Sequence, residues 1–153
     1  MTSEIDTLVK TSQLISKVTA DLNKDQLLKM ANGFNNHIFW HMGHIPVTLA
    51  LLTYKRCQLP MPFEKEMISF FGKGSSPKEW DSKFPSIKSI RELLEEIPLQ
   101  IKKDYESGKF NEFESYETSV GINLDCIENS LNFLTFHNGI HLGYIIAQKR
   151  VLK

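Results

Sequence analysis

Apolar residues recur at the three- and four-residue spacing of an α-helix in four stretches of the chain. In the first stretch, Thr2 or Ser3 can cap the start and acidic residues follow in the first turn. Its apolar face would be formed by Ile5, Leu8, Ile15, Val18 and Leu22. The four stretches predict long helices over residues 4–21, 35–56, 86–105 and 123–149. We also expect a brief helical turn over residues 26–30.

Proline residues and irregular segments interrupt or separate the four helical stretches. Pro46 lies inside the second predicted helix, where it removes a backbone donor and clashes with the carbonyl four residues back, so we expect a kink there. Residues 58–85 are rich in Pro, Gly and Ser and contain the pair Phe70 and Phe71. A connection of this length is typical of a functional cover. Residues 109–121 are acidic and aromatic, and we expect an irregular loop or a short extended pair.

Four long helices without any sustained strand-like alternation indicate an all-α fold. The economical arrangement is an antiparallel four-helix bundle that forms a single domain over residues 1–153. A chain of this length buries enough apolar surface to fold without a disulfide or a metal ion.

The amino-acid composition argues against some classes of binding partner. The chain has 18 basic and 18 acidic residues, and no cluster of basic residues with interleaved aromatics that would track a phosphate backbone, so we expect no nucleic-acid partner. Cys57 and Cys126 lie far apart and form no CxxC pair, which is typical of a reducing compartment. Neither a signal peptide nor a membrane-length apolar run is visible. We therefore expect a soluble, cytoplasmic protein with no membrane partner.

All five histidines fall in two short segments, residues 36–44 and 136–141. His137 and His141 are four residues apart, so on a helix they share one face and both can reach a single metal ion. That face also carries mostly apolar residues and Tyr144, which predicts that it turns inward. An inward imidazole pair without a metal ion would need buried hydrogen-bond partners, and the pair would repel if both rings were protonated.

The second predicted helix carries the other histidines, His37, His41 and His44, again on one stripe. Helix geometry allows any of the three to supply a third ligand. An HxxxH pair alone is more often a polar patch than a site, and this one lacks the glutamate of an HExxH motif. The second cluster of histidines favours the metal site. Small residues beside the candidates suggest a close approach of helices around the site: Gly43, Gly139 and Gly143.

Two motifs resemble those of a known family, the DinB-like (DinB/YfiT-like) proteins. The segment from Asn36 to Ile45, with Trp40, His41, Gly43 and His44, is similar to the family's Asn-x-x-x-Trp-His-x-Gly-His-Ile. The segment from His137 to Ile145 is similar to its His-x-x-x-His-x-Gly-Gln/Tyr-Ile, with Tyr144 where glutamine is frequent. The resemblance extends weakly over almost the whole chain.

The resemblance implies an up-down-down-up four-helix bundle with a divalent metal ion, zinc in the first place and nickel as the alternative. Carried over position by position, the metal ligands are His44, His137 and His141. His41 would then lie behind a ligand or in the pocket, and His37 would cap the helix or face solvent.

Three imidazole ligands leave a coordination position open, which is typical of a catalytic site. The resemblance implies a metal-dependent hydrolase or a transferase of low-molecular-weight thiols such as bacillithiol, mycothiol or glutathione. Asp104, Asp125 and Glu128 resemble ordinary helix-surface acids and offer no general base beside a ligand, which slightly favours thiol transfer. His41 and Tyr144 are the candidate catalytic donors of the pocket, with core packing and solvent contact as the alternatives for both residues.

Two further expectations concern the use of the site. We expect the protein to be a homodimer, and we expect it to act on a small-molecule substrate. The alternative to an enzyme is a metal-stabilised stress-response or binding protein without catalysis. Cys126, about three turns from His137, is too distant to be a ligand and is expected to pack in the core.

Overall fold

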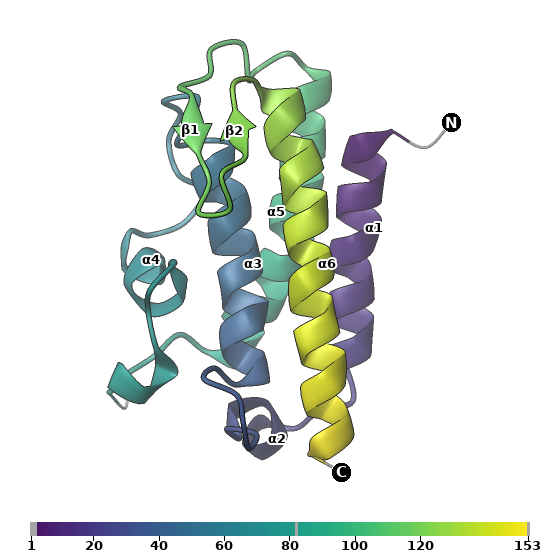
Figure 1. Ribbon diagram of the computed structural model, residues 1–153, viewed down its shortest axis with the longest axis vertical. Helices are drawn as coiled ribbons and strands as arrows, with labels where there is room; N and C mark the ends of the chain where they lie inside the picture. The colour runs from purple at the N-terminus through teal and green to yellow at the C-terminus, as the bar shows by residue number, and fades with distance from the viewer. Residues whose placement is uncertain (1–2, 82, 153) are drawn as a thin grey trace.

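Most helices begin after a residue whose side chain accepts a hydrogen bond from a backbone N–H group of the first turn. That N–H group has no partner within the helix itself. The computed structural model describes residues 3–81 and 83–152 (Figure 1). Ser3 and Asp6 form a capping box at the start of the first helix, and Ser86 accepts from the amide of Ser89 at the start of another. The elements in chain order are α1 (Glu4–Thr19), α2 (Lys24–Leu28), α3 (Ile38–Leu52), α4 (Glu66–Phe71), the short 3₁₀ helix η1 (Pro77–Glu79), α5 (Ile87–Glu106), β1 (Tyr116–Glu117), β2 (Asn123–Leu124) and α6 (Ile127–Val151).

The four long helices lie side by side along the long axis of the molecule (Figure 1). α1 packs against α5 and α6, and α3 packs against the same two helices from the other side. Figure 1 shows α1 and α6 running toward the bottom of the view and α3 and α5 toward the top. The packed pairs α1–α5 and α3–α6 are therefore antiparallel, while α1–α6 and α3–α5 are parallel. The prediction of an all-α fold is confirmed.

α3 is the most deeply buried helix, because α4, α5 and α6 pack around it. It continues through Pro46, and its apolar side chains are largely inaccessible to solvent. The helix ends at Leu52 rather than at Arg56, the end predicted from the pattern. Tyr54 and Cys57 are buried in the following turns, so buried side chains continue along the sequence beyond the end of the helix.

A short hairpin replaces the predicted first turn of the last helix. β1 and β2 pair antiparallel, with Tyr116 opposite Leu124 and Glu117 opposite Asn123. α6 consequently begins at Ile127, four residues later than predicted from the pattern. The expectation of a short extended pair is confirmed, although its second strand lies beyond residue 121, where the loop was predicted to end.

The long connection over residues 58–85 folds onto α3. It contains α4 and η1, and Phe71 at the end of α4 is fully buried. The ring of Phe71 meets Phe39 edge-on at 5.8 Å and Trp80 at 5.2 Å between centroids. This aromatic packing fixes the last turn of α4 beside the middle of α3.

Asp104 is not the surface acid that the sequence suggested. Only 6% of its area is exposed, and it accepts hydrogen bonds from Tyr54 Oη at 2.6 Å, Gln100 Nε2 at 3.0 Å and Lys109 Nζ at 3.1 Å. Burial alone would raise the pKa of this carboxyl, but the hydrogen bonds from these three donors outweigh burial and lower it. Asp104 thus ties α5 to the end of α3, away from the histidines.

Candidate metal centre

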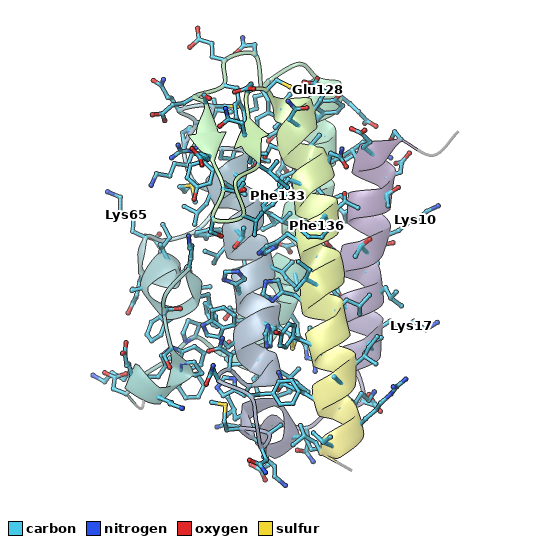
Figure 2. The ribbon with its side chains drawn as sticks, in the orientation of Figure 1. Lys10, Lys17, Lys65, Glu128, Phe133 and Phe136 are labelled. Atoms are coloured by element: carbon cyan, nitrogen blue, oxygen red, sulfur yellow. The ribbon has the colours of Figure 1, made fainter. Side chains whose placement is uncertain are left out.

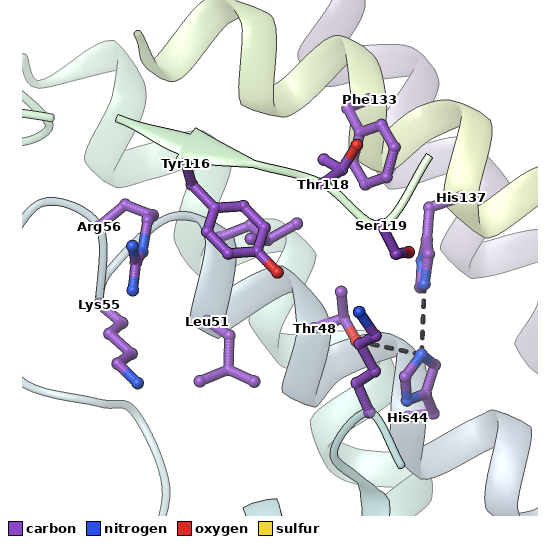
Figure 3. A pocket seen from close by; sticks show the side chains of 12 residues that line it. His44, Thr48, Leu51, Lys55, Arg56, Tyr116, Thr118, Ser119, Phe133 and His137 are labelled. Atoms are coloured by element: carbon purple, nitrogen blue, oxygen red, sulfur yellow. Dashed lines mark hydrogen bonds between the residues drawn. The ribbon is translucent and has the colours of Figure 1, made fainter. Parts of the chain in front are cut away.

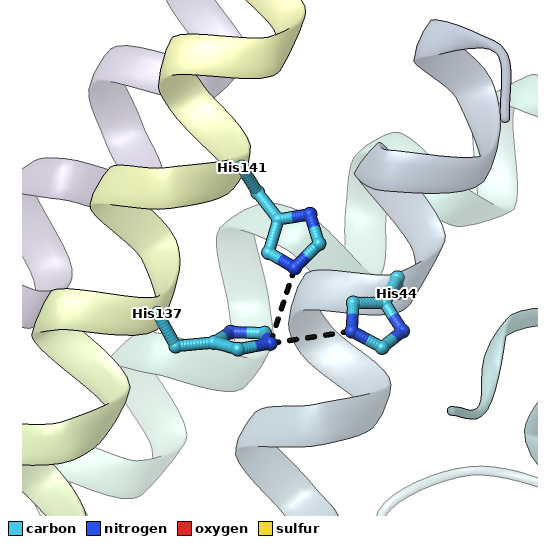
Figure 4. Close-up of side chains that lie close together, drawn as sticks. All are labelled: His44, His137 and His141. Atoms are coloured by element: carbon cyan, nitrogen blue, oxygen red, sulfur yellow. Dashed lines mark hydrogen bonds between the residues drawn. The ribbon is translucent and has the colours of Figure 1, made fainter. Parts of the chain in front are cut away.

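Three histidines from two antiparallel helices meet between α3 and α6 (Figure 4). Nε2 of His137 lies 3.2 Å from Nε2 of His44 and 3.1 Å from Nε2 of His141. All three nitrogens lie within 4.8 Å of one another. His44 is buried, and the two histidines on α6 are partly buried. The inward placement predicted for His137 and His141 is therefore observed.

The neighbours of His44 hold its ring in one orientation. Nδ1 of His44 lies 2.6 Å from the carbonyl oxygen of Phe71, which can only accept, so Nδ1 carries the proton. The lone pair of His44 is consequently on Nε2, which faces the other two histidines. Trp40 stacks on the same ring at 4.4 Å between centroids, and its indole nitrogen donates to Ser75 Oγ at 3.0 Å.

His141 is oriented in a similar way by a side chain rather than by the backbone. Its Nδ1 lies 2.8 Å from Nδ1 of His41, so one hydrogen is shared between these two nitrogens. With that hydrogen on His141, its Nε2 presents a lone pair toward His137. Nδ1 of His137 is buried and has no hydrogen-bond partner among the described residues.

The spacing of His137 Nε2 from the other two nitrogens suits a metal ion. Two nitrogens that each lie 2.0–2.1 Å from a tetrahedral ion stand about 3.3 Å apart, close to the 3.1 Å and 3.2 Å found here. Without an ion, lone pairs on His44 and His141 would both face His137, which can donate only one hydrogen from Nε2. Imidazole sets of this kind bind zinc, copper, iron and nickel.

Burial keeps these imidazoles neutral. It lowers the pKa of His44 to about 4, and burial followed by the neighbouring His44 lowers the pKa of His137 to about 4. The pKa of His141 falls well below its usual value because of burial and of His137, His44 and His41 around it. Neutral imidazole is the form that binds a metal ion, so the site is ready to coordinate at neutral pH.

The other two histidines of α3 have distinct positions. His37 is the N-cap of α3, and its Nδ1 accepts from the amide of Trp40 at 3.0 Å. This confirms capping over solvent exposure, since His37 is buried. His41 contacts His141 on one side and, on the other, stacks with the ring of Tyr144 at 5.6 Å.

Tyr144 belongs to the face of α6 that was predicted to turn inward, but the structure shows the alternative of solvent contact at this position. Half of its area is exposed, because α6 turns this position toward solvent beyond His41. Its ring also meets Phe34 edge-on at 6.1 Å. The catalytic role expected for His41 and Tyr144 stays a prediction, and neither residue is among those lining the cavity described next.

A cavity of about 330 Å³ opens beside His44 and His137 (Figure 3). Its walls come from α3, the turn after it, the segment after α4, the hairpin region and α6. Besides the two histidines, it is lined by Thr48, Leu51, Leu52, Lys55, Arg56, Lys73, Tyr116, Thr118, Ser119 and Phe133. None of these residues carries a carboxylate. Thr48 Oγ1 lies 3.3 Å from Nε2 of His44, so a hydroxyl borders the site on the cavity side.

Both histidine motifs fall within a match to a known protein family. The family model for the DinB superfamily matches residues 7–145, which include both histidine segments. The chain belongs to the DinB superfamily. A comparison with curated proteins finds no match. The DinB-like resemblance of the two motifs is thereby confirmed, and the three-histidine cluster is compatible with metal binding in this superfamily.

Within residues 3–81 and 83–152 of this DinB-superfamily chain, no helix combines the length and apolarity needed to cross a bilayer.

Most of the cavity wall was missed from sequence. Thr48 and Phe133 lie one helical turn from His44 and His137, so helix phase alone could have placed them beside the site. Tyr116 and Thr118 come from the hairpin region, and no local pattern connects them to the histidines.

The glycines differ in their roles. A Cβ on Gly43 would lie 2.3 Å from Cδ1 of Phe71, so the close approach predicted at Gly43 is present, and its neighbour is the α4 aromatic ring. At Gly139 and Gly143 a Cβ would meet nothing within 4 Å, and both positions are exposed. The expectation of close helix packing at these two glycines is wrong, because they lie on the outer face of α6.

Proposed function

We propose that this DinB-superfamily protein binds one divalent metal ion on His44, His137 and His141 and uses it to transfer a small thiol to an electrophile. The observation that carries the proposal is the convergence of three imidazole nitrogens, two of them on histidines that line a cavity without carboxylates. Three protein ligands leave room for a substrate atom, whereas a closed structural site uses four. Zinc is the expected ion and nickel the alternative.

The choice of thiol transfer rests on what the cavity lacks. Hydrolysis requires a base to take a proton from attacking water, and no acid lines this cavity among the described residues. A bound divalent ion supplies Lewis acidity, which lowers the pKa of a thiol or a water. A thiol starts from a pKa of about 8.5, so it needs less help than water to lose its proton near neutral pH.

The reaction that this arrangement serves is a simple displacement. The sulfur of the thiolate forms a bond to the electrophilic carbon, the bond from that carbon to its leaving group breaks, and the thiol proton passes to solvent. The apolar side chains of Leu51, Leu52 and Phe133 shield the thiol from water. The Thr48 hydroxyl borders His44 and can donate a hydrogen bond to an anionic atom in the cavity.

The residues behind the ligands have a positioning role in this proposal. His41 holds the ring of His141 through the Nδ1 contact, and Tyr144 covers His41 from the solvent side. We further propose that the protein is a homodimer, which is supported by a ridge of half-exposed apolar side chains on α6. The ridge consists of Phe136, Ile140 and Tyr144.

Two measurements test the function. Elemental analysis of untagged protein should find about one divalent ion per chain, and His44→Ala and His137→Ala should lose it. The matched control is His37→Asn, which removes a histidine but keeps an N-cap acceptor and should retain the ion. Equal metal content in all four proteins would contradict the site.

Activity is tested with the metal-loaded protein, a panel of thiols and monochlorobimane, whose thiol adduct is fluorescent. We expect a rate with at least one thiol that disappears on chelation and in His137→Ala. A metal-dependent rate with esters or amides, and none with any thiol, would replace transfer by hydrolysis. Bound metal without either activity would favour the non-catalytic alternative.

A further inference from the structure

The cavity has opposite kinds of residue at its two ends (Figure 3). His44 and His137 lie at one end, with Thr48 beside them, and Lys55 and Arg56 lie at the other. The chain as a whole has 18 basic and 18 acidic residues, so a wall with several cations and no acid is a local departure from the average.

Three cationic side chains line the cavity: Lys55, Arg56 and Lys73. Within the described residues, neither Lys55 nor Lys73 has a carboxylate within 4.0 Å. Both lysines are exposed, so their ammonium groups are accessible to a ligand that enters the cavity.

Arg56 is held in place but retains an unused donor. Its guanidinium carbon lies 5.1 Å from the centre of the Tyr116 ring, and its Nη1 lies 3.6 Å from a carboxylate oxygen of Glu114. The Arg56 side chain is only 16% exposed, whereas that of Glu114 is 60% exposed. Nε of Arg56 is buried and has no hydrogen-bond partner among the described residues. The Arg56 guanidinium thus places a fixed and largely buried positive charge at this end of the cavity.

We infer that this cavity selects a thiol that carries a carboxylate or phosphate group at the end remote from its sulfur. At 1.5 Å per residue, the segment of α3 from His44 to Leu52 spans about 12 Å, and Lys55 and Arg56 lie in the turn after it. The substrate is thus an elongated molecule with sulfur at the histidines and its anionic group at Lys55 and Arg56. The identity of the reacting atom rests on the proposed function, whereas the anionic end rests on the cations alone.

Matched pairs of thiols test the inference by binding. Phosphopantetheine and pantetheine differ only in a terminal phosphate, and glutathione and its dimethyl ester differ in two carboxylates. Isothermal titration of the metal-loaded protein, without electrophile and in phosphate-free buffer, should show about tenfold tighter binding of the charged member in at least one pair. The pair that discriminates identifies the anion. Equal affinities within both pairs would overturn the inference.

Substitution of a cavity lysine tests which residue recognises the anionic group of the thiol. The variant Lys55→Gln changes an exposed residue, so it should fold, and it should weaken the preference for the charged thiol while binding the neutral thiol as before. Lys10→Gln is the control, since Lys10 points away from the helices on the outer side of α1 (Figure 2). Equal weakening of the binding of charged and neutral thiols in Lys55→Gln would contradict recognition by this lysine.

Glu114→Gln gives a test by gain of affinity. Removal of the exposed carboxylate leaves Arg56 to the ligand, so the charged thiol should bind about two- to fivefold more tightly and the neutral thiol should not change. No gain in Glu114→Gln, together with no loss in Arg56→Gln, would exclude Arg56 from the anion site.

The proposed function and the inferred anion preference can be refuted independently of each other. If His137→Ala without metal keeps the preference for charged over neutral compounds but no thiol is transferred by the wild type, only the proposed function falls. If the wild type transfers charged and neutral thiols with equal kcat/KM, only the anion preference falls.

Discussion

The ring of Phe71 occupies the space that a side chain on Gly43 would need. An added Cβ would lie 2.3 Å from Cδ1 of the ring, far inside van der Waals contact. The same Phe71 offers its carbonyl oxygen to Nδ1 of His44, one residue after Gly43. A glycine in α3 therefore permits the approach of α4 that orients a candidate metal ligand.

This contact predicts opposite effects for two glycine substitutions. Gly43→Ala should lower the free energy of unfolding by about 1–3 kcal/mol, because Phe71 must shift out of a packed core. Gly139→Ala should raise it by about 0.5–1 kcal/mol, because alanine favours the helix and its Cβ meets nothing. Urea unfolding of both metal-free variants checks the pair. Equal stability of Gly43→Ala and the wild type would show that Phe71 is free to move.

His41 offers a test of positioning behind the ligands. Removal of its side chain in His41→Ala leaves Nδ1 of His141 without its partner, so metal affinity should fall about 10- to 100-fold without being abolished. His141→Ala should have a larger effect, since it removes a ligand. Competition with a chromogenic chelator measures both affinities. If His41→Ala binds metal as tightly as the wild type, the contact has no role in the site.

The buried histidines predict a dependence of stability on pH. Burial lowers the pKa of His37 to about 4, and burial with His44 and His37 nearby lowers the pKa of His41 to about 3. In the unfolded chain both return to about 6.5, so below that pH the unfolded state binds more protons. The free energy of unfolding of the metal-free protein should therefore fall steadily from pH 6.5 to pH 4.

Denaturant titration at several pH values in the presence of a chelator measures this slope. His37→Asn is the control, because it keeps a cap on α3 and removes one of the titrating groups. Its slope between pH 6.5 and pH 4 should be shallower than that of the wild type. A metal-free protein whose stability is constant over this range would contradict the lowered pKa values.

The ridge on α6 predicts how the proposed dimer forms. Ile140 is 43% exposed and lies between Phe136 and Tyr144, one helical turn from each. Ile140→Glu should convert the dimer to a monomer in light-scattering chromatography. Leu99→Glu, at an equally exposed apolar position on α5, should leave the dimer intact. A wild-type protein that elutes as a monomer at high micromolar concentration would refute the dimer.

The sequence predicted those parts of the molecule that depend on helix periodicity. The positions of α1 and α5 and the shared face of His137 and His141 follow from apolar spacing, and the structure agrees to within a few residues. Geometry left His37, His41 and His44 equivalent as third ligands. The structure distinguishes them, because His37 caps the helix and His41 contacts the far nitrogen of His141.

Contacts between distant segments were out of reach of the sequence. Asp104 looked exposed because its partners Tyr54 and Lys109 are brought to it by a turn and a helix end. Tyr144 looked inward because apolar spacing does not distinguish the core from an exposed ridge. The cavity wall joins segments that only tertiary packing places together, and its cations carried no local signal.

The hairpin and the turn after α3 are joined by a bond from the Glu114 amide to the Arg56 carbonyl at 2.7 Å, and Tyr116 covers Arg56. The three histidines belong instead to the helices α3 and α6. The proposed anion-binding residues and the proposed metal ligands thus lie in separate parts of the chain. Under the proposed function, changes in these two loops would alter the preferred substrate without touching the three histidines.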